Sequence, residues 1–127
     1  YPSEDEVPLD GPNVYGLTKS FGEQICRYFA REFDFNLAVF RITGPRPRER
    51  YIEDRTKQTM TTDGIIRVTD EEDLAKAYLA GIDYVQTGHG RCDTFFISGD
   101  DTHESINMSK ARAVLGWQPE TQGKLGI

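Results

Sequence analysis

The segment Tyr15-Gly16-Leu17-Thr18-Lys19 is the part of this chain around which the rest can be arranged. If the surrounding residues form a helix, Tyr15 and Lys19 lie one turn apart and their side chains leave the same face. A tyrosine alone titrates near pH ~10, and a nearby cation favours the phenolate and lowers that pKa toward neutrality. Such a pair can pass a proton to or from a substrate oxygen while a hydride moves elsewhere. By itself the motif also fits an ordinary exposed pair, because a chain with six tyrosines often contains Tyr-x-x-x-Lys by chance.

The residues around this motif predict a helix followed by a strand. The helix is expected to begin near Asn13, whose side chain can cap it, and to end near Phe33 or Asp34. Apolar residues recur in it every three or four positions and predict one buried face. Residues 36–42 are nearly all apolar and have the length of a strand covered on both faces, as in a parallel sheet. The apolar helical positions are Val14, Leu17, Phe21, Ile25, Tyr28 and Phe29.

Gly22 lies inside this expected helix, where glycine costs about 1 kcal/mol relative to alanine. The glycine is either simply tolerated or marks the close approach of another backbone.

Three arginines follow the strand in the segment 43–50 of an otherwise acidic protein. Guanidinium groups bind phosphate or carboxylate in a bidentate manner, and an open α/β sheet places its ligands at the carboxyl ends of its strands. The alternative is a solvated charged loop in which Glu49 and Glu53 are the counterions. Residues 51–64 are polar and end in the turn signal Asp63-Gly64, after which residues 65–68 are of strand type.

The second half of the chain shows a second helix and a second strand. Residues 69–72 read as a capping box, which predicts a helix to about Val85 with its first acidic residues in a structural role. Residues 93–98 form another apolar strand. Ser109 is expected to cap a short helix that closes at Gly116, with Trp117 packing back against it.

Together these features resemble the extended short-chain dehydrogenase/reductase family, the NAD-dependent epimerases and dehydratases that act on sugars and nucleotide sugars. The resemblance covers about residues 7–120 and implies an α/β fold. The expected structure is a partial Rossmann-like fold, the latter part of a doubly wound parallel sheet, with two main helices and a short C-terminal helix in a single domain over residues 1–127. The motifs that carry it are the lead-in 7–12, Tyr15 with Lys19, the strand end Arg41-Ile42-Thr43-Gly44-Pro45, and the ending Ser109-Lys110-Ala111-Arg112…Leu115-Gly116-Trp117-x-Pro119.

The resemblance also implies a catalytic site. Tyr15 would be the catalytic acid/base, and Lys19 would be a second catalytic residue that holds the cofactor ribose and lowers the tyrosine pKa. Thr43 would border the nicotinamide of NAD(P), while Arg46 and Arg48 would contact the sugar or its phosphate. The family's catalytic serine has no counterpart here, because Ser3 does not match its position. The short segment 51–64 is closest to members with compact substrates, such as the uronate dehydrogenases.

One part of the family pattern is missing, namely the glycine-rich turn that cradles the dinucleotide. We therefore expect the isolated chain to be inactive. Two alternatives remain open: a self-associating binding or structural module without dehydrogenase activity, and an active uronate-type sugar dehydrogenase when the chain is joined to a missing N-terminal half. A strand at 37–42 would leave one edge without a partner, which predicts a homodimer or higher oligomer. In the family, the Tyr/Lys helix also packs in a four-helix dimer interface.

Composition excludes several other classes of function. The net charge of −6 argues against nonspecific binding to nucleic acid or anionic lipid, and no apolar run has membrane-spanning length. Cys26 and Cys92 lie far apart and the chain has only two histidines, so no metal site is expected. We expect two reduced thiols in a soluble cytoplasmic protein. The sequence gives neither the substrate nor the choice of NAD over NADP.

Overall fold

The computed structural model describes residues 14–61, 67–87, 92–102 and 106–121 of the 127-residue chain. Asn13, Ser3, the turn at 63–64 and both histidines lie outside these ranges. The elements are α1 (Val14–Phe33), β1 (Leu37–Ile42), β2 (Gly44–Arg46), α2 (Arg48–Thr61), β3 (Val68–Asp70), α3 (Glu71–Gln86), β4 (Cys92–Ile97) and the short π-helix η2 (Ala111–Leu115).

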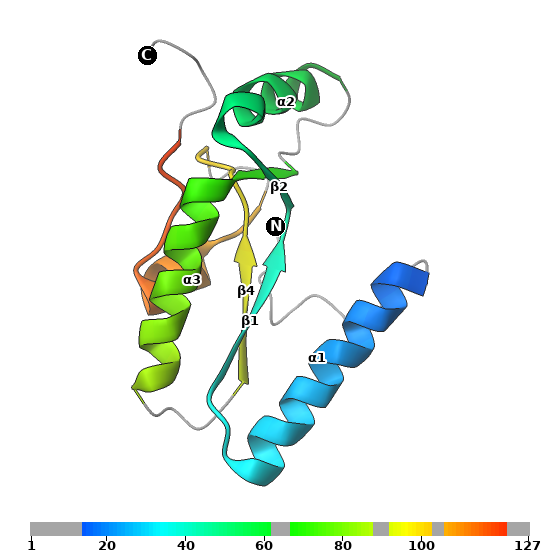
Figure 1. Cartoon of the computed structure of the whole chain (residues 1–127), viewed down its shortest axis with the longest axis vertical. Helices are drawn as coiled ribbons and strands as arrows, with labels where there is room; N and C mark the ends of the chain where they lie inside the picture. Colours follow the sequence, from blue (N-terminus) through cyan, green and yellow to red (C-terminus); the bar gives the residue numbers. More distant parts are fainter. Residues whose placement is uncertain (1–13, 62–66, 88–91, 103–105, 122–127) are drawn as a thin grey trace.

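The strands form two small parallel sheets (Figure 1). In the first, β1 pairs with β4 in a register that sets Leu37 opposite Cys92 and Ile42 opposite Ile97. In the second, β2 pairs with β3. The prediction of an α/β fold with parallel strands is confirmed. Within the described residues, β4 is the strand that pairs with β1, on one of its two edges.

Helices lie on both faces of the β1–β4 sheet. Side chains alternate along a strand, so Phe95 and Ile97 of β4 point to one face, where they are completely buried beside α3 and η2. Met108 and Trp117 close this core from the C-terminal side. The opposite face of the sheet is turned toward α1, so β1, whose sequence is nearly all apolar, has helices on both sides.

The orientation of α1 differs from the prediction, although its bounds agree with it. The apolar positions that were expected to be buried are exposed by at least 40%, and Val14 by 77%. The helix instead turns its polar side to the sheet, where Ser20 and Ala30 are the buried positions among its described side chains. A Cβ at Gly22 would meet no described atom, so no backbone approaches there. The exposed stripe, called the α1 apolar stripe below, consists of Val14, Leu17, Phe21, Ile25, Tyr28, Phe29 and Phe33.

Helix α2 was not predicted. It occupies a polar segment whose sequence has no apolar period, and its described part is held by one fully buried side chain, Tyr51, which packs on Val68 of β3. The tyrosine hydroxyl donates to the carbonyl of Gly99 at 2.7 Å. Because Gly99 follows β4 and its amide donates to the carbonyl of Val68, this contact ties α2 and the second sheet to the first.

The ends of the later helices are close to the predicted ones. Asp70 caps α3, and its carboxylate accepts from the amide of Glu72. Gly116 has a left-handed conformation with φ of 69° and closes the last helix, with Trp117 buried behind it, as predicted. The predicted cap at Ser109 is wrong, because Asn107 performs that role: its side-chain oxygen accepts from both the amide and the hydroxyl of Ser109.

Candidate functional site

Helix α1 runs antiparallel to the strands of the first sheet. Arg41 of β1 donates to both carboxylate oxygens of Glu23 at 2.8 and 3.2 Å, and one turn later Arg27 donates to Thr94 of β4 at 3.2 Å. Later residues of the helix therefore lie beside earlier residues of the strands. Its first turns, with positions 15 and 19, lie toward the carboxyl ends of β1 and β4 (Figure 1).

The predicted acid/base pair lies in these first turns. Tyr15 and Lys19 are both in α1, so the helix that their spacing required is present and places them one turn apart. Lys19 is exposed, and the side chain of Tyr15 lies outside the described part of the structure.

Thr43 lies at the carboxyl end of β1 inside a cluster of three hydroxyl groups. Its amide donates to the carbonyl of Ile97 at 3.0 Å, so it continues the sheet by one residue. Its hydroxyl is 2.8 Å from that of Thr69 and donates to that of Ser98 at 3.1 Å. Thr69 and Ser98 are fully buried. The cluster thus fixes Thr43 at the point where β1, β3 and β4 end.

The two arginines predicted to bind substrate contact different carboxylates. Arg46 donates to Asp54 of α2 at 2.8 Å and to the carbonyl of Pro45. Arg48 contacts Asp70 with two nitrogens, at 3.0 and 2.7 Å. The described counterions of Arg46 and Arg48 are therefore Asp54 and Asp70, where the sequence had suggested Glu49 and Glu53. The two guanidinium groups do not share one anion, and both have partners within the chain.

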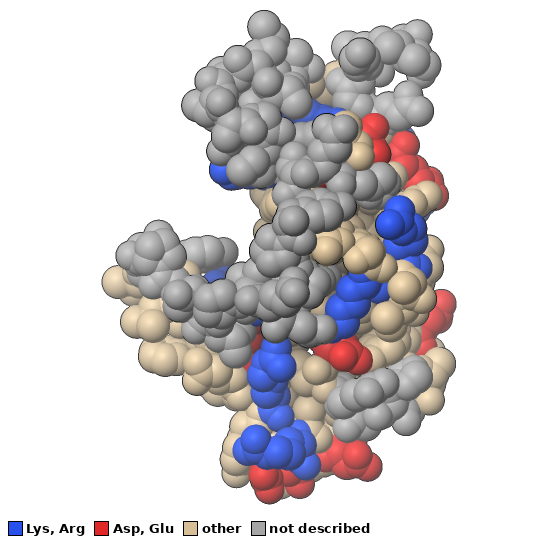
Figure 2. All heavy atoms as spheres, turned by 180° about the vertical axis from the view of Figure 1, so that it is seen from behind, with Lys and Arg blue, Asp and Glu red and all other residues tan. Residues whose placement is uncertain are grey.

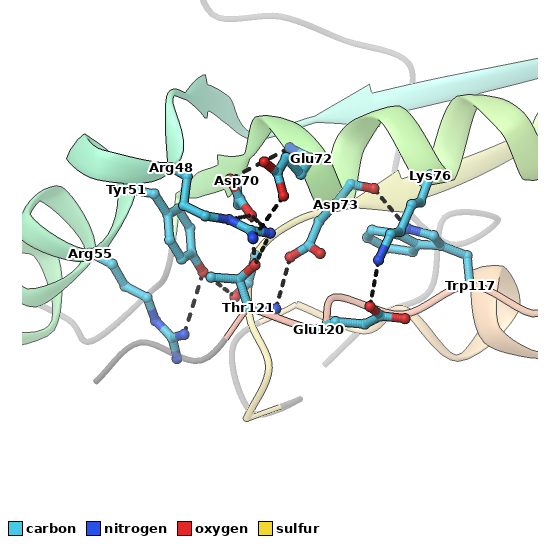
Figure 3. Close-up of polar contacts among 11 residues, drawn as sticks. Arg48, Tyr51, Arg55, Asp70, Glu72, Asp73, Lys76, Trp117, Glu120 and Thr121 are labelled. Atoms are coloured by element: carbon cyan, nitrogen blue, oxygen red, sulfur yellow. Dashed lines mark hydrogen bonds and ion pairs between the residues drawn. The ribbon is translucent and has the colours of Figure 1, made fainter. Parts of the chain in front are cut away.

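Arg48 belongs to a larger polar cluster at the start of α3 (Figure 3). Besides Asp70 it contacts Glu72 at 2.7 Å and the hydroxyl of Thr121 at 3.1 Å, and that hydroxyl donates to Asp70 at 2.6 Å. Complete burial of the Asp70 side chain favours a raised pKa, but the hydrogen bonds from Arg48 and Thr121 outweigh it, so the pKa of Asp70 is lowered. At the acidic start of α3, Asp70 thus both caps the helix and binds Arg48 as an ionised carboxylate.

Asp73 holds the C-terminal segment against this cluster. Its carboxylate accepts from the amide of Thr121 at 3.0 Å, and its backbone carbonyl accepts from the indole nitrogen of Trp117 at 2.9 Å. Lys76 and Glu120 form an exposed ion pair beside them (Figure 3). The sequence did not reveal these contacts, because each joins residues more than forty positions apart. The sequence indicated only that Trp117 packs back after the turn at Gly116.

Tyr51 forms the other side of this region. Arg55 donates to its hydroxyl at 3.4 Å and pairs with Asp101. Burial raises the pKa of Tyr51 to about 12, against the opposing effect of Arg55. The hydroxyl therefore stays protonated at neutral pH and serves as a fixed donor to the backbone of Gly99.

Metal and membrane sites are not found in the described ranges. No group of three histidine, cysteine or acidic side chains is arranged there to hold a metal ion, and no helix there is long and apolar enough to cross a membrane. On the face opposite to Figure 1, lysine and arginine side chains lie in separate groups beside acidic ones (Figure 2).

Comparison with known proteins identifies solved structures with the same fold. No protein-family model and no curated protein matches the sequence. Among solved structures, a mutated uronate dehydrogenase matches with a TM-score of 0.66 and 19% identity, over 93% of this chain and 38% of its own length. Glucuronic acid dehydrogenase from Chromohalobacter salexigens matches with a TM-score of 0.66 and 18% identity, over 94% and 40%. A UDP-galactose 4-epimerase matches with a TM-score of 0.68 and 18% identity, over 94% and 52%.

This chain thus spans between 38% and 52% of the length of these proteins. Identities this low establish a shared fold and nothing about the reaction. The chain has the fold of part of these uronate dehydrogenase, glucuronic acid dehydrogenase and UDP-galactose 4-epimerase structures, which agrees with the fold that the sequence resemblance led us to expect.

Proposed function

We propose that this chain forms the proton-transfer corner of an NAD(P)-dependent dehydrogenase or epimerase that acts on a sugar or nucleotide sugar. The observation that supports the proposal is the direction of α1. Because the helix is antiparallel to β1 and β4, its first turns, which contain Tyr15 and Lys19, lie toward the carboxyl ends of these strands. Thr43 is held at the same end of the sheet. That end of a parallel sheet is where α/β enzymes bind their ligands.

The proposed chemistry rests on the tyrosine. Its oxygen would accept the proton of a sugar hydroxyl, or return one, while a bound nicotinamide cofactor supplies or accepts the hydride. In this proposal the positive charge of Lys19, one turn away on the helix, would stabilise the negative charge that develops on the tyrosine oxygen. General acid/base groups of this kind contribute about 10²- to 10⁴-fold to a rate.

The described residues do not fit a complete dinucleotide. A phosphate cradle needs backbone amides at a glycine-rich helix start, and the described strands lead into none. The arginines nearest the carboxyl end of β1 already bind Asp54, Asp70 and Glu72. We therefore propose that the chain alone binds NAD(P) weakly and is inactive, and that a glycine-rich βαβ unit docked at the second edge of β1 completes the site.

This proposal can be tested by NADH fluorescence titration. The chain is titrated by itself and fused behind the glycine-rich βαβ unit of a uronate dehydrogenase. We expect no binding tighter than about millimolar for the chain alone, and micromolar binding for the fusion that is weakened by Lys19→Ala. A fusion that is folded but binds no NADH, or that binds it equally well with Lys19→Ala, would contradict the proposed cofactor role. Uronates are the first substrates to assay, because two of the matching structures are named as uronate or glucuronic acid dehydrogenases.

A second candidate function is self-association without dehydrogenase activity. It is favoured by the α1 apolar stripe, which faces outward along a surface with few charged side chains at the left of Figure 2. A helix of 20 residues is about 30 Å long, so the stripe offers a long apolar contact to a second copy.

Sedimentation equilibrium tests this candidate. We expect a dimer at micromolar concentration that Phe21→Glu converts to monomer, because the charge falls in the middle of the stripe. Gln24→Glu adds the same charge at an exposed polar position of α1 and should leave the dimer intact. A folded monomer for the unmodified chain would exclude the homodimer.

A further inference from the structure

A half-buried ion pair joins α1 to the β1–β4 sheet. Arg41 of β1 donates through Nε and Nη2 to the two carboxylate oxygens of Glu23, at 2.8 and 3.2 Å. Its guanidinium also lies over the ring of Phe96, its paired residue on β4, at 5.8 Å from the ring centre. The side chains of Arg41 and Glu23 are 19% and 14% exposed, whereas those of Arg31 and Glu32, an ion pair within α1, are 70% and 48% exposed. Because water screens it less, the pair between helix and sheet is the stronger of the two.

A second polar contact lies one turn later on α1. Arg27 donates to the hydroxyl of Thr94 at 3.2 Å. On the helix, positions 23 and 27 are about 6 Å apart, at a rise of about 1.5 Å per residue. On the sheet, Thr94 pairs with Val39, two residues before Arg41, so the two contact points are about 7 Å apart at about 3.3 Å per residue. Because these spacings agree, one axial register of α1 satisfies both contacts, and a shift of the helix by one residue would break both.

The α1 apolar stripe does not set this register, because it faces away from the sheet. Apolar packing is also non-directional and tolerates sliding, whereas a guanidinium that binds both oxygens of a carboxylate has a fixed geometry. The axial position of α1 on the sheet therefore depends on Glu23 and Arg41.

We propose, on the basis of the function proposed above, that Glu23 and Arg41 are positioning residues that hold Tyr15 and Lys19 at the carboxyl end of the sheet. Lys19 lies one turn before Glu23, about 6 Å toward that end. Thr43 lies two residues after Arg41, about 7 Å in the same direction. The ion pair thus keeps Lys19 about level with Thr43. Neither Glu23 nor Arg41 touches the substrate in this arrangement, and both act through the placement of the helix.

The register is measured in the full chain as the distance between spin labels at Gln24 of α1 and Asp83 of α3. Both positions are exposed, and the two helices lie on opposite faces of the sheet. The labels are attached to introduced cysteines after Cys26→Ser and Cys92→Ser. We expect a narrow distance distribution when the ion pair is intact. In Glu23→Gln the distribution should shift by about 1.5 Å or more, the rise of one helical residue, or become at least twofold broader.

Three further variants separate register from a general loss of structure, with circular dichroism to confirm that each is folded. Arg41→Lys keeps the charge but cannot bind both oxygens, so it should broaden the distribution as Glu23→Gln does. The exchange of Glu23→Arg with Arg41→Glu restores the pair in reverse and should restore the narrow distribution. Glu32→Gln removes the exposed ion pair of the same helix and should change nothing. An unchanged distribution in Glu23→Gln and Arg41→Lys would overturn the proposal.

The consequence for the reaction is measured in the fusion with a glycine-rich βαβ unit. A misplacement of about 1 Å can cost about 10²-fold in rate, so Glu23→Gln should lower kcat for a uronate at least tenfold and change its KM less than about twofold. A kcat equal to that of Glu32→Gln would overturn the positioning role. A fusion of the unmodified chain without activity would contradict the proposed function, while the label distances would still decide whether Glu23 and Arg41 set the register.

Discussion

Replacement of Gly99 by alanine tests how the two sheets are joined. Gly99 is buried between β4, α2 and β3. A Cβ added there would lie 2.5 Å from the hydroxyl oxygen of Tyr51 and 2.6 Å from the carbonyl oxygen of Val68. The tyrosine ring is itself fully buried and the second atom belongs to the backbone of β3, so neither can move aside without disturbing the junction.

The size of the effect follows from these contacts. Overpacking of a buried site costs about 1–3 kcal/mol. Two buried hydrogen bonds meet at this glycine, from its amide to Val68 and from Tyr51 to its carbonyl, and each contributes about 0.5–1.5 kcal/mol. We expect Gly99→Ala to lower the free energy of unfolding by about 2–4 kcal/mol, a large share of the ~5–15 kcal/mol that a domain possesses.

Urea denaturation followed by circular dichroism measures this loss. With a slope near ~2 kcal/mol per molar urea, the midpoint should fall by about 1–2 M. Gly22→Ala is the matched control, because a Cβ meets open space there and alanine in a helix is better by about 0.5–1 kcal/mol. The same change should thus stabilise at one glycine and destabilise at the other. If Gly99→Ala stays within about 0.5 kcal/mol of the unmodified chain, the junction is not built as described.

Three further predictions concern the polar region around α3. Because the folded pKa of Asp70 lies below the unfolded value of about 3.9, its stabilising effect is complete above that pH and is lost as the pH falls through the folded pKa. Asp70→Asn should therefore cost about 1–3 kcal/mol in urea at pH 7, through its lost bond to Arg48, and progressively less as the pH is lowered below the unfolded value. A cost that does not change over this acid range would refute the prediction. Trp117→Phe removes the indole donor to the buried carbonyl of Asp73 and should lower the free energy of unfolding by about 1–3 kcal/mol. A thermal midpoint, measured by calorimetry, that equals that of the unmodified chain would contradict this. In an ultraviolet titration of the folded protein, one tyrosine should ionise last, near pH 12, and this step should be absent from Tyr51→Phe. If all six tyrosines titrate near pH ~10 in the folded protein, Tyr51 is not buried.

The sequence predicted those elements whose structure depends on neighbouring residues. The bounds of α1 and α3 follow from capping residues and apolar periods, and β1 and β4 follow from short apolar runs. The left-handed turn at Gly116 follows from the preference of that conformation for glycine.

The sequence could not predict features that depend on distant partners. Helix α2 has no apolar period, since a single fully buried apolar side chain, Tyr51, anchors its described part. The described partners of Arg48 and Asp73 lie in other elements, so local charge patterns did not reveal them. The predicted orientation of α1 was wrong because the apolar stripe of the helix was assumed to pack against the β1–β4 sheet.

The proton-transfer role of Tyr15 is the central claim, and one kinetic comparison tests it most directly. In the fusion with a glycine-rich βαβ unit, kcat for a uronate is measured by NADH absorbance for the unmodified protein, Tyr15→Phe and Tyr28→Phe. Tyr28 is a half-exposed tyrosine on the same helix and serves as the matched control. We predict that Tyr15→Phe lowers kcat by about 10²- to 10⁴-fold with NADH affinity preserved, while Tyr28→Phe changes it less than about twofold. Equal rates for the two variants would contradict the account.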